Sequence, residues 1–374
     1  MEWWEGPVLH HSGIPILHSV DTMNLTLKPD IDEARRYWNA FWAGEIIDRP
    51  AICLKVAPPP GSPPHPSGLS SIDDPAAHVR AFGEWASHVK WLAEAVPFYF
   101  PNHGPDMFAA WVGGDLRYSP DSDGTTWSVP VVRDWTTDAR EIDHPHGQWW
   151  DRMLELLRTA ADIAEGKFLV GTTDIHGNMD GLSALRGPQD LCMDLFDIPE
   201  QIDAAMQTVR KAFPKVIDGI SKAGRMDGRG YIGWLPFYSE TKYAVLQCDF
   251  ACMIGPEHFR RWVLPALEEE SSYLDHSVYH YDGPDALVHL QDVLSIPGIR
   301  AIQWTPGAGN PPVIEWMDLL VECQKAGKAV YIGASADEIP VYYRHLRPEH
   351  VLYDVTVGSE KEAEDLLRWM KDHM

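Results

Sequence analysis

Short apolar segments alternate with amphipathic helical segments along nearly the whole chain, and this alternation limits the possible folds more than any other feature. Segments that are apolar on both faces are typical of parallel strands covered by helices. Eight such segments, each followed by a crossover element within about 300 residues, predict an α/β fold, a single (β/α)8 TIM barrel. The predicted strands are residues 51–57, 97–102, 167–174, 230–237, 277–282, 299–305, 329–335 and 351–357.

A doubly wound open sheet is the alternative, but no predicted strand is followed by a glycine-rich phosphate loop. Residues 1–49, which include the amphipathic stretch "DIDEARRYWNAFWAGEI", are predicted to form an N-terminal helical extension. Residues 50–374 then form the barrel domain. The polar stretch after the second strand carries the turn signal "PDSDG" and predicts a hairpin insertion.

Charge and composition narrow the class of partner. The chain of 374 residues has a formal net charge of −24, which disfavours binding to nucleic acid or to an anionic membrane surface. It lacks an apolar run of about 18 residues and a signal-peptide pattern, so we expect a cytoplasmic protein. Five cysteines, an odd number on a long chain, argue against a disulfide framework. Sixteen tryptophans suit an aromatic small-molecule pocket, although any single one is better explained by core or interface packing.

Polar and aromatic side chains gather where the predicted strands end. Active sites of (β/α)8 enzymes lie at the carboxyl ends of the strands, so these positions form the candidate site. The candidate catalytic residues are Asp174, His176, Glu240, His280 and Asp282. The candidate substrate-binding residues are Asn102, His103, Trp234, Tyr238, Gln303, Trp304 and Tyr353.

Two histidines have a carboxylate two residues away. Because residues i and i+2 of a strand point the same way, Asp174 with His176, and His280 with Asp282, can each face one cavity. Such pairs suit general acid–base catalysis or a divalent metal held by nitrogen and oxygen. A histidine at a strand end is also often a hydrogen-bonded structural residue, and Glu240 also reads as a solvated loop residue. The pair in "CDFAC" reads as buried structural cysteines, and its Asp249 as a capping or pocket-lining residue.

Several phrases resemble the uroporphyrinogen decarboxylase superfamily. They are "EIIDRPAICLKV", "GLSALRGPQDLCMDLFDIPEQIDAAM", "LQCDFACMIGPEHFRRWVLPAL" and "SVYHYDGPDALVHLQDVLSIPGIRAIQW", in an order that agrees with the strand assignment. The resemblance runs from about residue 45 to the C-terminus and implies a (β/α)8 barrel and a homodimer. It also implies either a cofactor-free decarboxylase or a zinc-dependent methyltransferase that serves a corrinoid protein.

The chain departs from both patterns. The arginine-rich "MRQAGR" phrase of the decarboxylases is missing, which disfavours uroporphyrinogen as the substrate. The methyltransferases bind zinc through a His-x-Cys and a later Cys, whereas here His280 is followed by Asp282, and no cysteine lies in residues 351–357. The resemblance therefore implies an oxygen-rich site in which His280 and Asp282, with or without Asp174, His176 or Glu240, hold zinc or another divalent metal. Such a site suits polarising an oxygen substrate or activating water.

The first hypothesis is a methyltransferase-type enzyme for a small oxygenated metabolite, linked to a metal and to a corrinoid as methyl donor or acceptor, with a corrinoid protein as partner. The alternative is a decarboxylase or lyase acting on a small acid, a sugar derivative or, as the less favoured substrate, uroporphyrinogen, through the same His/Asp pairs. A third hypothesis is a non-catalytic barrel that binds a small molecule.

Overall fold

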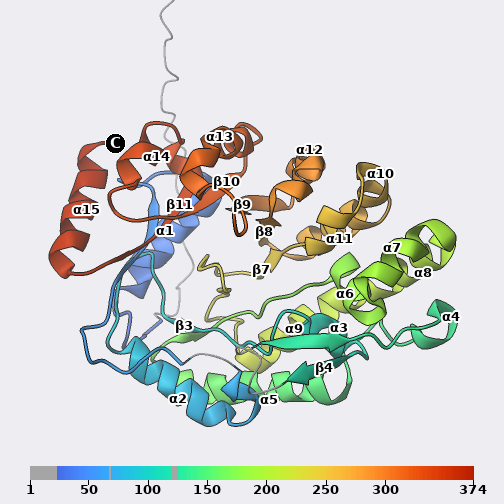
Figure 1. Ribbon diagram of the computed structural model, residues 1–374. Helices are drawn as coiled ribbons and strands as arrows, with labels where there is room; N and C mark the ends of the chain where they lie inside the picture. The colour runs from blue at the N-terminus through green and yellow to red at the C-terminus, as the bar shows by residue number, and fades with distance from the viewer. Residues whose placement is uncertain (1–22, 67–68, 119–124) are drawn as a thin grey trace, which may run out of the picture.

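The main sheet of the computed structural model has seven strands in the order β2-β1-β11-β10-β9-β8-β7 (Figure 1). The structure describes residues 23–66, 69–118 and 125–374. All neighbouring strands of this sheet run parallel except β2, which pairs antiparallel with β1. The strands are β1 (Ala51–Val56), β2 (Lys90–Ala93), β7 (Tyr243–Leu246), β8 (His276–Asp282), β9 (Ile299–Thr305), β10 (Ala329–Gly333) and β11 (Val351–Val357).

A second, short parallel pair joins β3 (Phe98–Tyr99) to β6 (Leu169–Val170). The predicted α/β class and the alternation of helices with parallel strands are therefore confirmed. Within the described residues, however, strand pairing forms separate sheets and no continuous hydrogen-bonded ring. The predicted hairpin insertion is present as the antiparallel pair β4 (Asp115–Tyr118) and β5 (Thr126–Val129). Its connecting residues 119–124 lie outside the described part.

The prediction of a strand at residues 230–237 is wrong. This segment forms only an isolated bridge between Tyr231 and Ser239, and the regular strand of the region is β7. Gly230 has a φ of +95°, and Pro236 has no N–H to donate to a ladder, so the segment cannot continue as a strand. Each of the other predicted strands overlaps a strand of the structure.

Helix α1 (Ile31–Ala43) packs against the end of the sheet at which the parallel strands begin. Its apolar face includes Trp38 and Trp42, whose indole N–H groups donate to the carbonyls of Glu94 and Tyr238 at 3.0 and 2.8 Å. The helix ends at Gly44, whose φ of +70° is the left-handed conformation common after a helix. Of the predicted extension, residues 1–22 lie outside the described part.

The remaining helices pack outside the strands (Figure 1). In the described part of the chain, none of them combines the length and apolar character needed to cross a membrane. The longer ones are α2 (Pro75–Ala86), α5 (Gly147–Ala164), α6 (Asn178–Arg186), α7 (Pro188–Asp197), α8 (Pro199–Val209), α9 (Ala212–Gly224), α11 (Leu264–Tyr273), α13 (Met317–Lys325) and α15 (Glu360–Asp372). Shorter ones are α3 (Met107–Trp111), α4 (Trp135–Asp138), α10 (Pro256–His258), α12 (Leu290–Ser295), α14 (Ile339–Tyr343) and the 3-10 turns η2 (Asp249–Met253), η4 (Pro284–His289) and η5 (Val313–Trp316).

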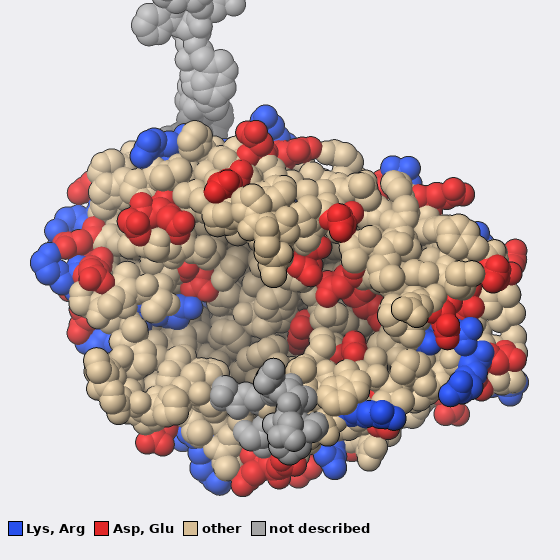
Figure 2. All heavy atoms as spheres, viewed as in Figure 1, with Lys and Arg blue, Asp and Glu red and all other residues tan. Residues whose placement is uncertain are grey.

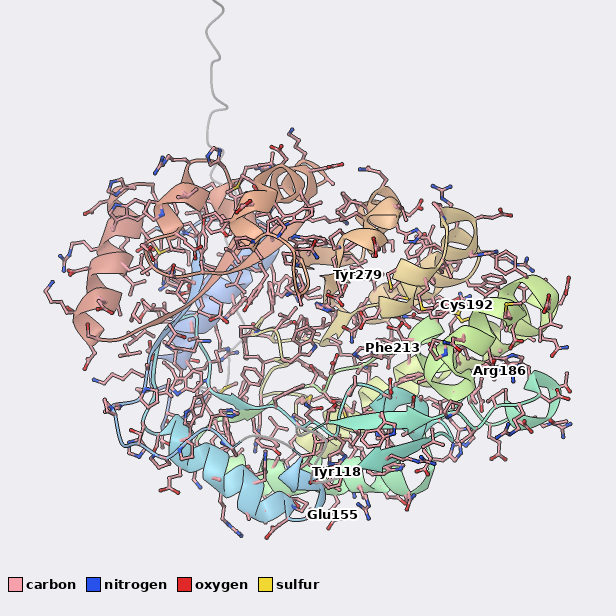
Figure 3. All side chains as sticks on the ribbon, in the orientation of Figure 1. Tyr118, Glu155, Arg186, Cys192, Phe213 and Tyr279 are labelled. Atoms are coloured by element: carbon pink, nitrogen blue, oxygen red, sulfur yellow. The ribbon has the colours of Figure 1, made fainter. Side chains whose placement is uncertain are left out.

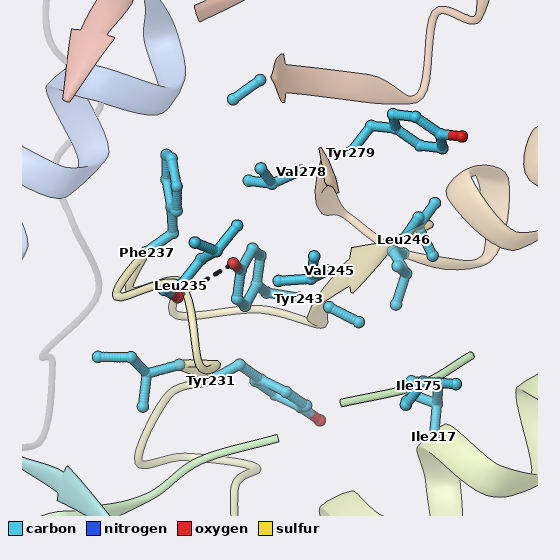
Figure 4. Close-up of a cluster of buried hydrophobic side chains, with 14 of the residues drawn as sticks. Ile175, Ile217, Tyr231, Leu235, Phe237, Tyr243, Val245, Leu246, Val278 and Tyr279 are labelled. Carbon is cyan, nitrogen blue, oxygen red and sulfur yellow. Dashed lines mark hydrogen bonds between the residues drawn. The ribbon is translucent and has the colours of Figure 1, made fainter. Parts of the chain in front are cut away.

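Buried side chains fill the space between strands and helices (Figure 3). The irregular segment before β7 contributes Leu235 and Phe237 to this core, beside Val245 and Val278 (Figure 4). The Tyr243 hydroxyl donates to the Leu235 carbonyl at 3.3 Å, which ties the segment to β7. The core therefore holds the start of β7 in place, and the strand delivers its carboxyl end to a defined position.

Candidate functional site

Three potential metal ligands converge at the carboxyl ends of β7 and β8. One oxygen of Asp249, one ring nitrogen of His280 and one oxygen of Asp282 all lie within 4.8 Å of one another. His280 and Asp282 share a strand face because they are two residues apart on β8, and Asp249 begins η2 just after β7. We call these three residues the Asp–His–Asp cluster.

Asp249 completes the cluster, and sequence reasoning assigned it only a capping or pocket-lining role. Its position is set by Asp180 of α6, whose carboxylate accepts hydrogen bonds from the backbone N–H groups of Asp249 and Phe250 at 2.9 and 2.8 Å. The signal that could have identified Asp249 is its place three residues after the apolar run "YAVL" that forms β7. Because the strand was wrongly predicted at residues 230–237, the residue expected at its carboxyl end was Glu240 instead of Asp249.

His176 lies beside the cluster among three carboxylates. Its Nε2 is 3.2 Å from Asp174 Oδ2, and its Nδ1 is 3.7 Å from both Asp180 Oδ2 and Asp249 Oδ2. Burial alone lowers the pKa of His176, but the carboxylates of Asp174 and Asp180 outweigh it and raise the pKa well above its ordinary value. The imidazolium form is therefore favoured at neutral pH.

The Asp249 carboxyl is in an environment that disfavours its charge. Burial, and then repulsion from Asp180, raise its pKa to about 6, although His176 and His280 act in the opposite direction. A bound cation would relieve this repulsion, since it would supply a positive charge next to several carboxylates. The electrostatics of the cluster thus suit a cation as well as its geometry does.

A cavity of about 400 Å³ adjoins the cluster. Figure 2 shows a hollow at the centre of this face, with acidic side chains along one wall. Trp234 connects the two features, since it lines the cavity and its ring meets the His280 ring edge to face, with centres 5.1 Å apart. The cavity is lined by Lys55, His65, Pro66, His78, Phe82, Trp85, Trp91, Phe98, Tyr99, Phe100, Asn102, Trp234, Pro236 and Asp354.

Of the predicted binding residues after β3, the structure places Asn102 in the cavity wall and His103 outside it. His103 is 1 % exposed, and its ring packs against Trp149 with centres 6.4 Å apart. Burial lowers its pKa to about 4, so the ring is neutral at neutral pH. His103 is therefore a core residue of this region.

Trp304 and Tyr353 do not line the cavity as predicted. Trp304 packs against Trp316 of η5 with ring centres 4.9 Å apart, and Tyr353 stacks on Tyr343 of α14 at 6.0 Å. Because side chains alternate along a strand, their neighbours face the other way. Those neighbours are Gln303, which bonds to His280, and Asp354, which lines the cavity.

Glu240 and Tyr238 are also placed away from the cluster. Glu240 accepts hydrogen bonds from Arg35 and Asn39 of α1 at 2.6 and 3.1 Å. The intervening Ser239 bonds to His276, the first residue of β8, at 2.9 Å. The segment therefore lies at the amino end of β8, whereas His280 and Asp282 lie at its carboxyl end. The cysteines of "CDFAC" differ from each other, with Cys248 buried and Cys252 exposed.

Comparison with known proteins gives a similarity of fold. No protein-family model matches the sequence, and no curated protein matches it. Among solved structures, the chain is similar to a methyltransferase from Methanosarcina mazei, with a TM-score of 0.57 and 12 % sequence identity. The match covers 91 % of this chain and 98 % of that one, so the likeness extends over nearly the whole fold.

Proposed function

We propose that this chain is a metal-dependent, methyltransferase-type enzyme of the uroporphyrinogen decarboxylase-like superfamily that acts on a small oxygenated metabolite. The observation that carries the proposal is the convergence of Asp249, His280 and Asp282 within 4.8 Å beside an open cavity. The similarity of the fold to a methyltransferase supports the same class of reaction.

The proposal includes a (β/α)8 barrel formed by residues 50–374. The Thr172 N–H, just after β6, donates to the carbonyl of Ile232 at 2.6 Å, which brings the irregular segment 230–237 next to the β3–β6 pair. This contact supports a ring in which β3, β6 and that segment bridge the ends of the main sheet. The cluster then lies at the carboxyl-end mouth, where barrel enzymes hold their active sites.

The donor set fits a divalent cation. One imidazole nitrogen and two carboxylate oxygens are ligands of the kind that catalytic zinc and harder divalent metals use. Asp249, His280 and Asp282 are the residues that would hold the metal. When bound, such an ion supplies Lewis acidity toward a substrate oxygen.

The chain's own residues supply the proton chemistry. Transfer of a methyl group from an ether-type oxygen breaks a C–O bond and leaves the oxygen in need of a proton. His176, kept protonated by Asp174 and Asp180, is the acid for that step. A corrinoid held by a partner protein is the proposed methyl acceptor, and in the reverse direction the donor.

Metal binding and methyl transfer test this proposal. The purified chain should bind about one equivalent of zinc, cobalt or manganese in calorimetry, and the Asp249→Asn and His280→Ala variants should bind at least tenfold more weakly. Asp285→Asn is the matched control, because Asp285 lies in the adjacent η4 but outside the cluster. Methyl exchange with free methylcobalamin is then followed by absorbance. Unchanged metal affinity in both cluster variants would falsify the metal assignment.

Decarboxylation of a small acid is the second candidate, and the protonated His176 favours it, since loss of CO2 leaves a carbanion that must be protonated. The two functions differ in their products. Release of CO2 from a small carboxylic acid by metal-free protein, with no methyl exchange, would select decarboxylation.

A further inference from the structure

The cavity beside the Asp–His–Asp cluster has a preassembled aromatic wall. The Trp85 ring contacts the rings of Phe82 and Trp91, with centres 5.6 and 6.0 Å apart, and Phe82 meets Tyr99 at 5.6 Å. On the side of the cluster, Trp234 contributes a further ring. Rings held in this way favour a flat aromatic ligand, which can stack or pack edge to face without reordering the wall.

One ion pair forms the polar end of this cavity. Lys55 of β1 pairs with Asp354 of the neighbouring strand β11, two residues out of register, with Nζ 2.7 Å from Oδ1. The Tyr331 hydroxyl donates to the other carboxylate oxygen, Oδ2, at 2.8 Å. The side chains of Lys55 and Asp354 are 24 % and 15 % exposed and both line the cavity, although Oδ1 of Asp354 is itself buried.

The pair selects against charged ligands of either sign. A ligand carboxylate that approaches Lys55 meets the carboxylate of Asp354, and a ligand ammonium meets Lys55. Among the described residues that line the cavity, Lys55 is the one lysine or arginine. A neutral hydroxyl satisfies both partners, because its oxygen can accept from Lys55 while its O–H donates to Asp354.

We propose that the cavity binds the substrate of the proposed enzyme as a neutral hydroxylated aromatic compound of the phenol class, with the hydroxyl at Lys55 and Asp354. The inference rests on the proposed function, and it adds the class of substrate. The volume of about 400 Å³ accommodates one or two rings, within the range of ~300–1,000 Å³ usual for small-molecule sites. The opposite edge of the ligand points toward Trp234 and His280, where the reacting group belongs.

The test is calorimetric titration of the full chain with 2-naphthol and three analogues. 2-Naphthol should bind at least tenfold more tightly than 2-methoxynaphthalene, which has no O–H to donate, and than 2-naphthoate, which is an anion. It should also bind tenfold more tightly than decahydro-2-naphthol, which keeps the hydroxyl and lacks the aromatic rings. Equal binding of the naphthoate or of the saturated alcohol overturns the inference.

Variants locate the bound hydroxyl. The Lys55→Met variant should bind 2-naphthol roughly tenfold or more weakly, since a hydrogen bond to a charged group is lost. Lys90→Met is the control, because Lys90 lies on the adjacent strand β2 and pairs with Glu360 at the surface. Equal loss in both variants, or none in Lys55→Met, contradicts the assignment. The analogue series on the unchanged chain decides the question where a variant does not fold.

Different outcomes contradict the substrate class inferred here and the metal-dependent function proposed above. The titrations are repeated on chelator-treated protein, and metal binding is measured on the same sample. Loss of discrimination among the four compounds while metal still binds overturns only the substrate class. Selective 2-naphthol binding by a protein that takes up no metal upholds the cavity assignment and overturns the metal-dependent function.

Discussion

Gln303 accepts a hydrogen bond from Nδ1 of His280 across the neighbouring strands β8 and β9. The Gln303 amide is itself oriented, because its Nε2 donates to the Thr305 hydroxyl at 2.6 Å. With the amide oxygen facing His280, Nδ1 is the donor in this bond, and in the neutral ring the lone pair then lies on Nε2, where a metal or a substrate proton can bind. This is the arrangement by which outer partners orient metal-binding histidines.

Replacement of Gln303 by Ala should therefore weaken zinc binding by about tenfold or more, because the His280 ring loses the partner that sets its tautomer and orientation. Calorimetry measures the effect. Gln291→Ala serves as the control, since Gln291 bonds to Glu322 on the surface. Equal zinc affinity in both variants would show that Gln303 does not orient the ligand.

Asp180→Ala should both destabilise the fold and disturb the cluster. Two backbone N–H groups of η2 lose their acceptor, at a cost of about 1–3 kcal/mol, and Asp249 is no longer held in place. Urea denaturation and zinc titration measure the two effects. Asp180→Asn keeps one acceptor oxygen and should recover part of the stability. A fully stable Asp180→Ala variant with normal zinc affinity contradicts this role.

Glu270 should make stability depend on pH on the alkaline side. It is 3 % exposed on α11, and burial is the main cause that raises its pKa to about 8 from an ordinary value of 4.5. The raised pKa means that the folded state binds the proton more tightly than the unfolded state. This contribution is fully present below about pH 4.5 and is lost as the pH rises through 8.

The variant Glu270→Gln removes the ionisation and keeps an oxygen that can accept from Asn178, which lies 3.2–3.3 Å from the carboxyl oxygens. From pH 6 to pH 9 the wild type should lose about 2.5 kcal/mol of unfolding free energy relative to this variant. Urea denaturation at both pH values checks the difference. Glu268→Gln, at an exposed position of the same helix, should show no such change. Parallel pH profiles of wild type and Glu270→Gln contradict the prediction.

Glu240→Gln should leave zinc and 2-naphthol binding unchanged. Glu240 pairs with Arg35 of α1, and the side chains are 33 % and 13 % exposed. Loss of a partly exposed ion pair is expected to cost less than about 1 kcal/mol. Calorimetry and urea denaturation provide the measurements. A tenfold loss of affinity for zinc or for 2-naphthol would show that Glu240 belongs to the site.

The alternation of apolar strands and helices was sufficient to predict the α/β class, because period and burial are local properties of the sequence. It also predicted that His280 and Asp282 would share a face, since i and i+2 alternation is a property of any strand. The same pattern failed at residues 230–237. The apolar residues there fill the core without pairing in a sheet, and their composition is the same as that of a strand.

The sequence by itself determined which strand ends carry imidazole and carboxylate groups, and it determined the acidic, tryptophan-rich character of the chain. Only the tertiary structure decided that Asp249 joins His280 and Asp282, and that Lys55 meets Asp354. Asp249 and His280 are 31 residues apart in the sequence, and Lys55 and Asp354 are 299 residues apart. The order and register of the strands therefore set the distances between these side chains. The same packing decided which face of each strand Trp304 and Tyr353 occupy, because a shift of one residue reverses every side chain.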